Sequence, residues 1–338
     1  MAEVELGELR SAFLPDPVPF AVLAPRPGGA PLPLCVVLFG GGGSRQSLVD
    51  CQPLFEAWWA EGSLPPMVLA SPSGGMSYYL EHPAGGIRWD AFLAEAFLDH
   101  LRATHAVGGD RASTAIIGLS MGGYGALKIA FARPDRFAAV AAMGAVLEPG
   151  LHDEEVTARN RLHHGSGGPA ALVGPARDPA VVDANRPAAR AVAHAASIRD
   201  HDLAIYLEVG SRDVINAHDG TEFLHRVLWD LDIAHEYRLA RDADHVGPTL
   251  VPRMRDAFVW LGATLTRHPE SESPAVTEWI AGGMVGAPPA VSPSSADAVR
   301  IIRAQLDGRR RQATADDPTT LRLYGILPGT SRCRPAPT

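Results

Sequence analysis

The sequence is poor in cysteine, in lysine and in long apolar segments, and these scarcities exclude several classes of protein. Its three cysteines, Cys35, Cys51 and Cys333, cannot all pair and show no metal-ligand spacing, so neither a disulfide framework nor a zinc cluster is expected. No apolar run approaches the roughly 18 residues that a membrane-spanning helix needs. Lys128 is the one lysine, and we attribute this skew toward arginine to coding bias.

Positive charge is also in deficit. The 30 basic residues are outnumbered by 38 acidic ones, which leaves a net charge of −8 and disfavours nucleic acid as a partner. The first residues include Glu3, Glu5 and Glu8, where a secretion signal would carry positive charge and then an apolar segment. We therefore expect a cytoplasmic protein with no membrane attachment.

Apolar segments alternate with helical patterns from about residue 18 to residue 265. This alternation predicts an α/β protein with a mostly parallel central sheet flanked by helices. Several of the apolar runs are continuous, as expected for strands buried on both faces. The predicted strands are 19–23, 34–39, 67–70, 114–117, 138–143, 204–209 and 236–239. The predicted helices are 54–61, 90–104, 121–132, 220–231 and 252–265.

Two regions interrupt this alternation, and they define the predicted domain organisation. Residues 146–200 are rich in glycine, proline and histidine, and a connection of this length is usually functional or has small helices of its own. We interpret them as an insert within a catalytic domain at 1–268. Residues 269–338 form a Pro/Ser/Ala-rich C-terminal extension with one predicted helix at 294–311. The extension is a candidate homo-oligomer contact, a lid or a loose appendage.

The most informative motif lies between a predicted strand and a predicted helix. Residues 118–122 read Gly-Leu-Ser-Met-Gly and match the pattern G-x-S-x-G. In a nucleophile elbow this pattern places the serine on a strained strand-to-helix turn, and the helix dipole favours negative charge beside it. The motif therefore predicts Ser120 as a nucleophile; the alternative is a glycine turn with a capping serine.

A serine nucleophile needs a base and an acid that orients the base, in the chain order Ser, Asp or Glu, His for this kind of fold. Asp213 follows the predicted strand 204–209, and His245 follows the predicted strand 236–239. Open α/β sheets place functional groups at these carboxyl ends of strands. We predict that His245 acts as general base and then acid, and that Asp213 orients its imidazole.

Alternatives for both partners remain open at this stage. The other candidate acids are Glu208, which lies inside the strand pattern, and Asp219, which lies near the following helix. The other candidate bases are His218 and His235, neither of which follows the last strand.

Four consecutive glycines at 40–43 follow the predicted strand 34–39, where such a fold carries an oxyanion loop. We predict that the backbone N–H groups of Gly41 and Met121 form the oxyanion hole; the alternative is a flexible turn without a role. No metal or organic cofactor is expected. Further candidates for an acyl or alcohol pocket, with core packing as the alternative for the aromatic ones, are Gly42, Tyr78, Tyr79 and Trp89.

Several landmarks accompany these candidates: FGGGGS at 39–44, PSGG at 72–75 with YY at 78–79, PAGG at 83–86, GLSMGGYGAL at 118–127 and GSRD at 210–213. Over about residues 10–265 the chain resembles the serine esterases of the α/β-hydrolase superfamily that include esterase D (S-formylglutathione hydrolase), the antigen 85 mycolyltransferases and feruloyl-type esterases. The resemblance implies an α/β-hydrolase fold, a Ser-Asp-His carboxylesterase and an insert that shapes the pocket.

The chain departs from this family at three places that bear on the substrate, and at one of them Gly41 stands where the antigen 85 proteins have a bulkier residue. Phe39 replaces the His or Asp that commonly precedes the first glycine, and His245 is followed by Val-Gly-Pro where many relatives have a tryptophan. The main hypothesis is a serine esterase that cleaves a small-molecule ester through an acyl-enzyme. The alternatives are an acyltransferase with the same triad and a catalytically inactive binding module.

Overall fold

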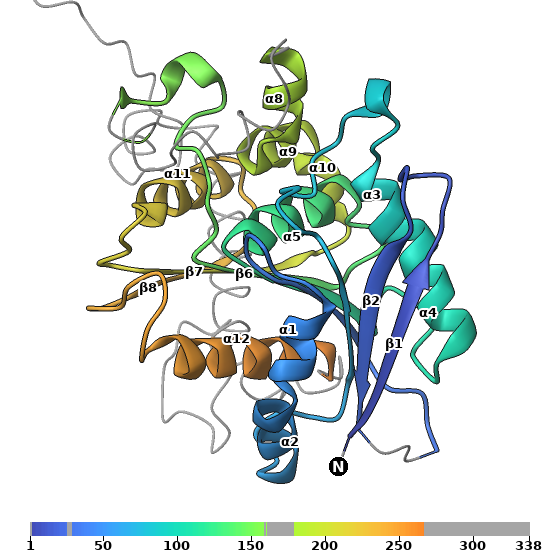
Figure 1. Ribbon diagram of the computed structural model, residues 1–338. Coiled ribbons are helices and arrows are strands. Elements are labelled where there is room, and N and C mark those ends of the chain that lie inside the picture. Colours follow the sequence, from blue (N-terminus) through green and yellow to red (C-terminus); the bar gives the residue numbers. More distant parts are fainter. Residues whose placement is uncertain (1, 26–28, 159, 161–178, 267–338) are drawn as a thin grey trace, which may run out of the picture. The chain divides into compact units, whose positions relative to one another are not determined.

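The computed structural model describes residues 2–25, 29–158, 160 and 179–266 (Figure 1). In this described part, eight strands form one sheet: β1 (Glu3–Leu9), β2 (Val18–Ala24), β3 (Leu34–Leu38), β4 (Val68–Pro72), β5 (Thr114–Leu119), β6 (Ala139–Met143), β7 (Ala204–Gly210) and β8 (Glu236–Ala240). Their order in the sheet is β1-β2-β4-β3-β5-β6-β7-β8. Strand β2 is antiparallel to both of its neighbours, and all other neighbouring strands are parallel. The predicted mostly parallel sheet is confirmed.

Sequence analysis predicts seven of these strands to within two residues of their bounds, but it does not predict β1. Strand β1 is an edge strand whose partner in the sheet is β2. Its apolar residues Val4 and Leu6 are 38% and 52% exposed. The segment EVELGEL alternates in polarity as a strand does, but neither face of it is covered well enough to demand a strongly apolar sequence.

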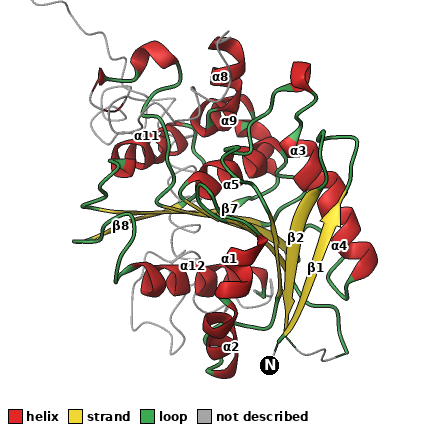
Figure 2. Cartoon of the chain, in the orientation of Figure 1, coloured by secondary structure: helices red, strands yellow, loops and turns green. Residues whose placement is uncertain are grey.

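Helices cover the central strands on both faces (Figure 2), which explains why every residue of β3, β4 and β6 is buried. One face packs against α1 (Arg45–Asp50), α2 (Gln52–Ala60) and α12 (Leu250–Leu265). The other face packs against a continuous helix formed by α3 (Trp89–Ala91), the π-helical turn η2 (Phe92–Phe97) and α4 (Leu98–Thr104), and against α5 (Met121–Ala132) and α11 (Ala217–Asp230).

All five predicted helices are present, with bounds that differ by up to three residues. Helix α1 is not predicted. It is only six residues long, too short for an apolar periodicity, and it begins after Ser44, whose Oγ accepts a hydrogen bond from the N–H of Gln46 at 3.2 Å.

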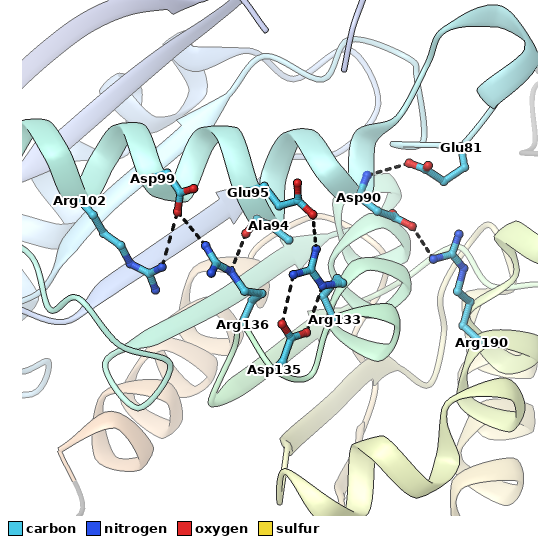
Figure 3. Close-up of polar contacts among 10 residues, drawn as sticks. All are labelled: Glu81, Asp90, Ala94, Glu95, Asp99, Arg102, Arg133, Asp135, Arg136 and Arg190. Carbon is cyan, nitrogen blue, oxygen red and sulfur yellow. Dashed lines mark hydrogen bonds and ion pairs between the residues drawn. The ribbon is translucent and has the colours of Figure 1, made fainter. Parts of the chain in front are cut away.

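The described part of the insert carries short helices that are fastened to the core by polar side chains. Asn185 binds the backbone of Glu81 twice, accepting from its N–H at 2.7 Å and donating to its carbonyl at 2.9 Å. Arg190 pairs with Asp90 at the start of α3 (Figure 3), and Asp90 also pairs with the buried Lys128 of α5. These helices are α8 (Pro179–Asn185), α9 (Pro187–Ala193) and α10 (Ala195–Asp200).

A second group of ion pairs joins the end of α5 to the helix α3–α4. Arg133 pairs with Glu95 at 2.7 Å, and Arg136 pairs with Asp99 at 2.8 Å (Figure 3). These contacts fix α5, the helix that follows the G-x-S-x-G motif, against its neighbour on the same face of the sheet.

The described residues up to Thr266 belong to one compact unit. The predicted extension at 269–338, its helix at 294–311 and residues 161–178 of the insert lie outside the described residues, so the division into a catalytic domain and an extension stays a prediction. Within the described residues, no helix has both the length and the apolar character needed to cross a lipid bilayer.

Candidate active site

Ser120 occupies a strained turn between β5 and α5. Its backbone has φ 57° and ψ −121°, in the region that residues with a side chain rarely adopt. Strand β5 ends one residue before it and α5 begins one residue after it, at Met121. The turn therefore presents the serine at the N-terminus of a helix, where the amide of Met121 has no acceptor within that helix.

The two glycines of the motif are needed because backbone segments meet at their Cα atoms. A Cβ atom on Gly118 would collide with the carbonyl oxygen of Gly122, and a Cβ atom on Gly122 would collide with the carbonyl oxygen of Leu38 at the end of β3. The strand, the turn and the helix can approach this closely only with glycine at both positions.

His245 lies between Ser120 and Asp213. Its Nε2 atom is 2.9 Å from Ser120 Oγ, and its Nδ1 atom is 2.8 Å from Asp213 Oδ2. A carboxylate only accepts hydrogen bonds, so Nδ1 carries the proton and Nε2 is left to accept from the serine hydroxyl. The three side chains predicted from sequence thus form one connected line across three loops that follow β5, β7 and β8.

The carboxylate of Asp213 is buried and held from its other side. Its Oδ1 atom accepts from the N–H of Ile215 at 3.0 Å and from the N–H of Ala217, the first residue of α11, at 3.3 Å. Its side chain is 0% exposed, whereas that of His245 is 12% exposed. The acid is therefore fixed within the protein, and its Oδ2 atom points to the imidazole.

The glycine loop after β3 lies directly against the nucleophile. A methyl group on Gly40 would be 3.3 Å from the Cβ atom of Ser120. The loop is shaped by hydrogen bonds from the N–H of Gly42 to the carbonyl of Gly75 at 2.9 Å and from the N–H of Gly43 to the carbonyl of Gly40 at 2.8 Å. Within the described part of the chain, the N–H of Gly41 has no acceptor, so it is free to bind an oxygen from outside.

The chain also matches a known protein family. Residues 11–246 match the family Esterase, described as "Putative esterase". The chain belongs to this esterase family. It is accordingly a carboxylic ester hydrolase, which confirms the enzyme class and the resemblance inferred from sequence. No curated protein matches the sequence of the esterase.

Among the solved structures that resemble the esterase, three share its fold at low sequence identity. A ferulic acid esterase has a TM-score of 0.62 at 19% identity, covering 78% of this chain and 98% of that chain. The S-formylglutathione hydrolase of Staphylococcus aureus has a TM-score of 0.60 at 18% identity, covering 78% and 99%. MPT51 of Mycobacterium tuberculosis has a TM-score of 0.57 at 17% identity, covering 78% and 100%. These likenesses confirm the predicted α/β-hydrolase fold.

The two alternative acids of the esterase have other partners. Glu208 points to Arg253 of α12, with Nε to Oε1 at 2.7 Å and Nη2 to Oε2 at 3.1 Å. Asp219 accepts from the side-chain amide of Asn216 at 2.8 Å and lies 3.3 Å from the ring of His218. The carboxylate that faces the His245 ring is that of Asp213.

The alternative bases also lie apart from Ser120. His218 faces Asp219. The Nε2 atom of His235 lies 2.7 Å from Nδ1 of His225, and its Nδ1 atom lies 2.8 Å from the carbonyl of Ile233. Since each has a partner elsewhere, the geometry favours His245 among the three histidines.

The aromatic pocket candidates are all buried. Tyr79 and Trp89 contact each other edge to face, with ring centroids 5.1 Å apart, and Tyr78 contacts Tyr124 of α5 in the same manner at 5.7 Å. This is the packing arrangement that sequence analysis names as the alternative, so contact of these rings with a substrate stays a prediction. Tyr78 and Tyr79 both have positive φ angles, 50° and 54°, so the loop that holds them is itself strained.

The groups that hold the histidine loop in place are not predicted from the sequence. Asp244 Oδ1 accepts from the N–H of His245 at 2.6 Å and from the N–H of Val214 at 2.8 Å, and these two backbone hydrogen bonds lower the pKa of Asp244. Burial raises the pKa of Glu208, while the hydrogen bonds and charge of Arg253 oppose that rise. Asp244 is one residue before His245 in the sequence, but no sequence pattern predicts its contacts with Val214 and Arg253.

Proposed function

We propose that the esterase cleaves small-molecule carboxylic esters through a covalent acyl-enzyme formed on Ser120. The observation that carries this proposal is the position of His245, with one ring nitrogen 2.9 Å from Ser120 Oγ and the other 2.8 Å from Asp213 Oδ2. His245 takes the hydroxyl proton as Ser120 attacks the ester carbonyl, and then donates that proton to the departing alcohol. Asp213 keeps the imidazole in the required tautomer and stabilises its charge.

The negative charge of the tetrahedral intermediate needs hydrogen-bond donors already in place. The N–H groups of Met121 and Gly41 fit this role, because the first begins α5 and the second has no acceptor in the described part of the chain. A Cβ atom on Gly40 would lie 3.3 Å from the Cβ atom of Ser120, so the loop that carries the Gly41 N–H lies against the nucleophile, and Met121 directly follows Ser120 in the chain. Water, activated by the same histidine, then cleaves the acyl-enzyme and restores Ser120.

The test is hydrolysis of p-nitrophenyl esters from acetate to dodecanoate by the wild type and by Ser120→Ala. We expect wild-type turnover and a loss of kcat of at least about 10⁴-fold in the variant, because the remaining groups cannot replace a nucleophile. The chain-length optimum would size the acyl pocket. A variant as active as the wild type would place the chemistry elsewhere.

Addition of an alcohol acceptor separates hydrolysis from the alternative of acyl transfer. Both reactions share the acyl-enzyme and differ only in the molecule that attacks it. A hydrolase yields mainly the free acid when the products are quantified, and a transferase yields mainly the new ester. A folded wild-type protein that neither turns over an ester nor accumulates an acyl-enzyme would support the binding-module alternative.

A further inference from the structure

A buried ion pair joins strand β7 of the sheet to helix α12, and it is separate from the contacts among Ser120, His245 and Asp213. Glu208 on β7 is 1% exposed and Arg253 on α12 is 7% exposed. Their two parallel hydrogen bonds, 2.7 Å and 3.1 Å long, form the bidentate arrangement in which arginine binds carboxylates most strongly. This geometry uses two of the three guanidinium nitrogens.

The third nitrogen reaches the histidine loop. Nη1 of Arg253 donates to the carbonyl oxygen of Asp244 at 2.6 Å, one residue before His245. The side chain of Asp244 in turn accepts from the backbone of His245 and from the backbone of Val214, next to Asp213. A single chain of hydrogen bonds therefore connects β7, α12, the histidine loop and the acid loop.

Glu208 also reaches the imidazole by a second route, through its backbone. Its carbonyl oxygen accepts from the N–H of Gly144 at 2.7 Å. A Cβ atom on Gly144 would lie 3.4 Å from Nδ1 of His245 and 3.8 Å from Oδ2 of Asp213, so this glycine backs the contact between them. Residue 208 thus supports both the chain that carries the histidine and the surface behind its ring.

We propose that Arg253 and Glu208 are positioning residues for His245: Arg253, held by Glu208, fixes the carbonyl of Asp244 and thereby keeps the imidazole between Ser120 and Asp213. The proposal rests on the proposed function, which makes His245 the base. Neither residue touches the reacting atoms, and His245 stands on a loop with no helix or strand of its own. An apolar pair would fill the same space but could not bind the loop carbonyl.

The decisive variant is the double substitution Glu208→Met with Arg253→Met. Replacing a buried ion pair by apolar side chains of similar size leaves no unpaired charge, so the fold is expected to survive. The hydrogen bond to Asp244 is nevertheless lost. We expect kcat for p-nitrophenyl acetate to fall on the order of 10- to 100-fold with little change in KM, because small displacements of a catalytic group have effects of this size.

Two single variants complete the series. Arg255→Met on the same helix removes an exposed ion pair with Glu61 at 3.0 Å and is the matched control, expected to retain wild-type kcat. Arg253→Lys keeps the positive charge beside Glu208 but has no planar group to bind three acceptors, so its kcat should lie between those of the wild type and the double variant. A purely space-filling role predicts no such order.

A spectroscopic measurement keeps the proposal testable without turnover. The Nδ1 proton between His245 and Asp213 should give a far-downfield proton NMR signal, assigned by its absence in His245→Gln. We expect this signal to be lost or shifted in the double variant and retained in Arg255→Met. If the wild type hydrolyses no ester but the signal responds in this way, the proposed function fails and the positioning role stands. A folded double variant with unchanged signal and unchanged kcat overturns the positioning role.

Discussion

The nucleophile elbow and the histidine loop hold their side chains by different physical means. At the elbow, Ser120 is fixed by backbone packing, since Gly118 and Gly122 allow a strand and a helix to meet within five residues. The histidine loop is held in part by side chains from another strand and another helix, since Arg253, paired with Glu208, binds the carbonyl of Asp244. Neighbouring parts of one site therefore differ in how far along the chain the residues that determine their geometry lie.

The largest effect is expected from a methyl group added inside the nucleophile elbow. Gly118→Ala would force its Cβ atom into the backbone of Gly122, so we expect a loss of at least about 4 kcal/mol in the free energy of unfolding, or no soluble protein. Urea unfolding measures this loss.

Gly62→Ala is the control for that measurement. Gly62 has a positive φ of 71°, unlike Gly118, but no atom lies within 4 Å of a Cβ added to it. It should cost only about 1 kcal/mol, the usual strain of a side chain in this conformation. Equal losses in the two variants would contradict the packing explanation of the motif.

The next largest effect concerns the acid. Asp213→Asn should lower kcat about 10³- to 10⁴-fold, because an amide donates a hydrogen bond where the carboxylate accepts one and the imidazole is held in the wrong tautomer. Asp219→Asn, at the alternative acid, should change kcat by no more than about twofold, the range expected away from the reacting groups. Steady-state kinetics on p-nitrophenyl acetate compares the two. The reverse ranking would make Asp219 the orienting acid.

A third substitution tests whether α5, the helix that follows Ser120, is also held in position by side chains distant in sequence. Lys128→Met in α5 removes one of the two cations that pair with the half-buried Asp90 and leaves Arg190, and we expect about 3 kcal/mol less stability with kcat retained in the folded enzyme. Thermal unfolding and kinetics of the same preparation measure the two quantities. A fall in kcat without loss of stability would show that Lys128 acts on the site itself.

The stability lost in Lys128→Met should depend on pH in a direction that follows from the pKa of Asp90. Burial on its own would raise the pKa of Asp90, but the charges of Lys128 and Arg190 hold it below its usual value. A carboxyl with a lowered pKa in the folded state contributes stability above its ordinary pKa, and this contribution disappears as the pH falls through the folded value. The difference in stability between wild type and Lys128→Met should therefore narrow below about pH 4. A constant difference would mean that packing, not charge, dominates.

The smallest expected effect lies at the end of the glycine loop. Ser44→Ala removes the side chain that caps α1 and should cost about 1 kcal/mol of stability. Because the cap lies beyond the loop hydrogen bonds of Gly42 and Gly43, kcat should be retained. Chemical denaturation and ester kinetics test the two statements together. A large loss of kcat would mean that α1 sets the geometry of the proposed oxyanion hole.

Much of the fold was predictable because its signals are local. Continuous apolar runs identify the buried strands, and the helix from Met121 to Ala132 has the predicted bounds. Strand β1 was not predicted because an edge strand with exposed apolar residues lacks a continuous apolar run. The insert helices α8, α9 and α10 are short, and contacts such as that of Asn185 with Glu81, 104 residues away, hold them in place.

The chemical groups available to this esterase are readable from its sequence: a serine in a glycine elbow, a glycine loop, and an acid and a histidine after later strands. Which acid faces which base depends on the folded arrangement, because Glu208 and Asp213 lie five residues apart in sequence but contact different side chains. Glu208 meets Arg253, and Asp213 meets His245. Such pairings depend on the direction of each side chain across the sheet and on the packing of α12, neither of which is encoded within a few neighbouring residues.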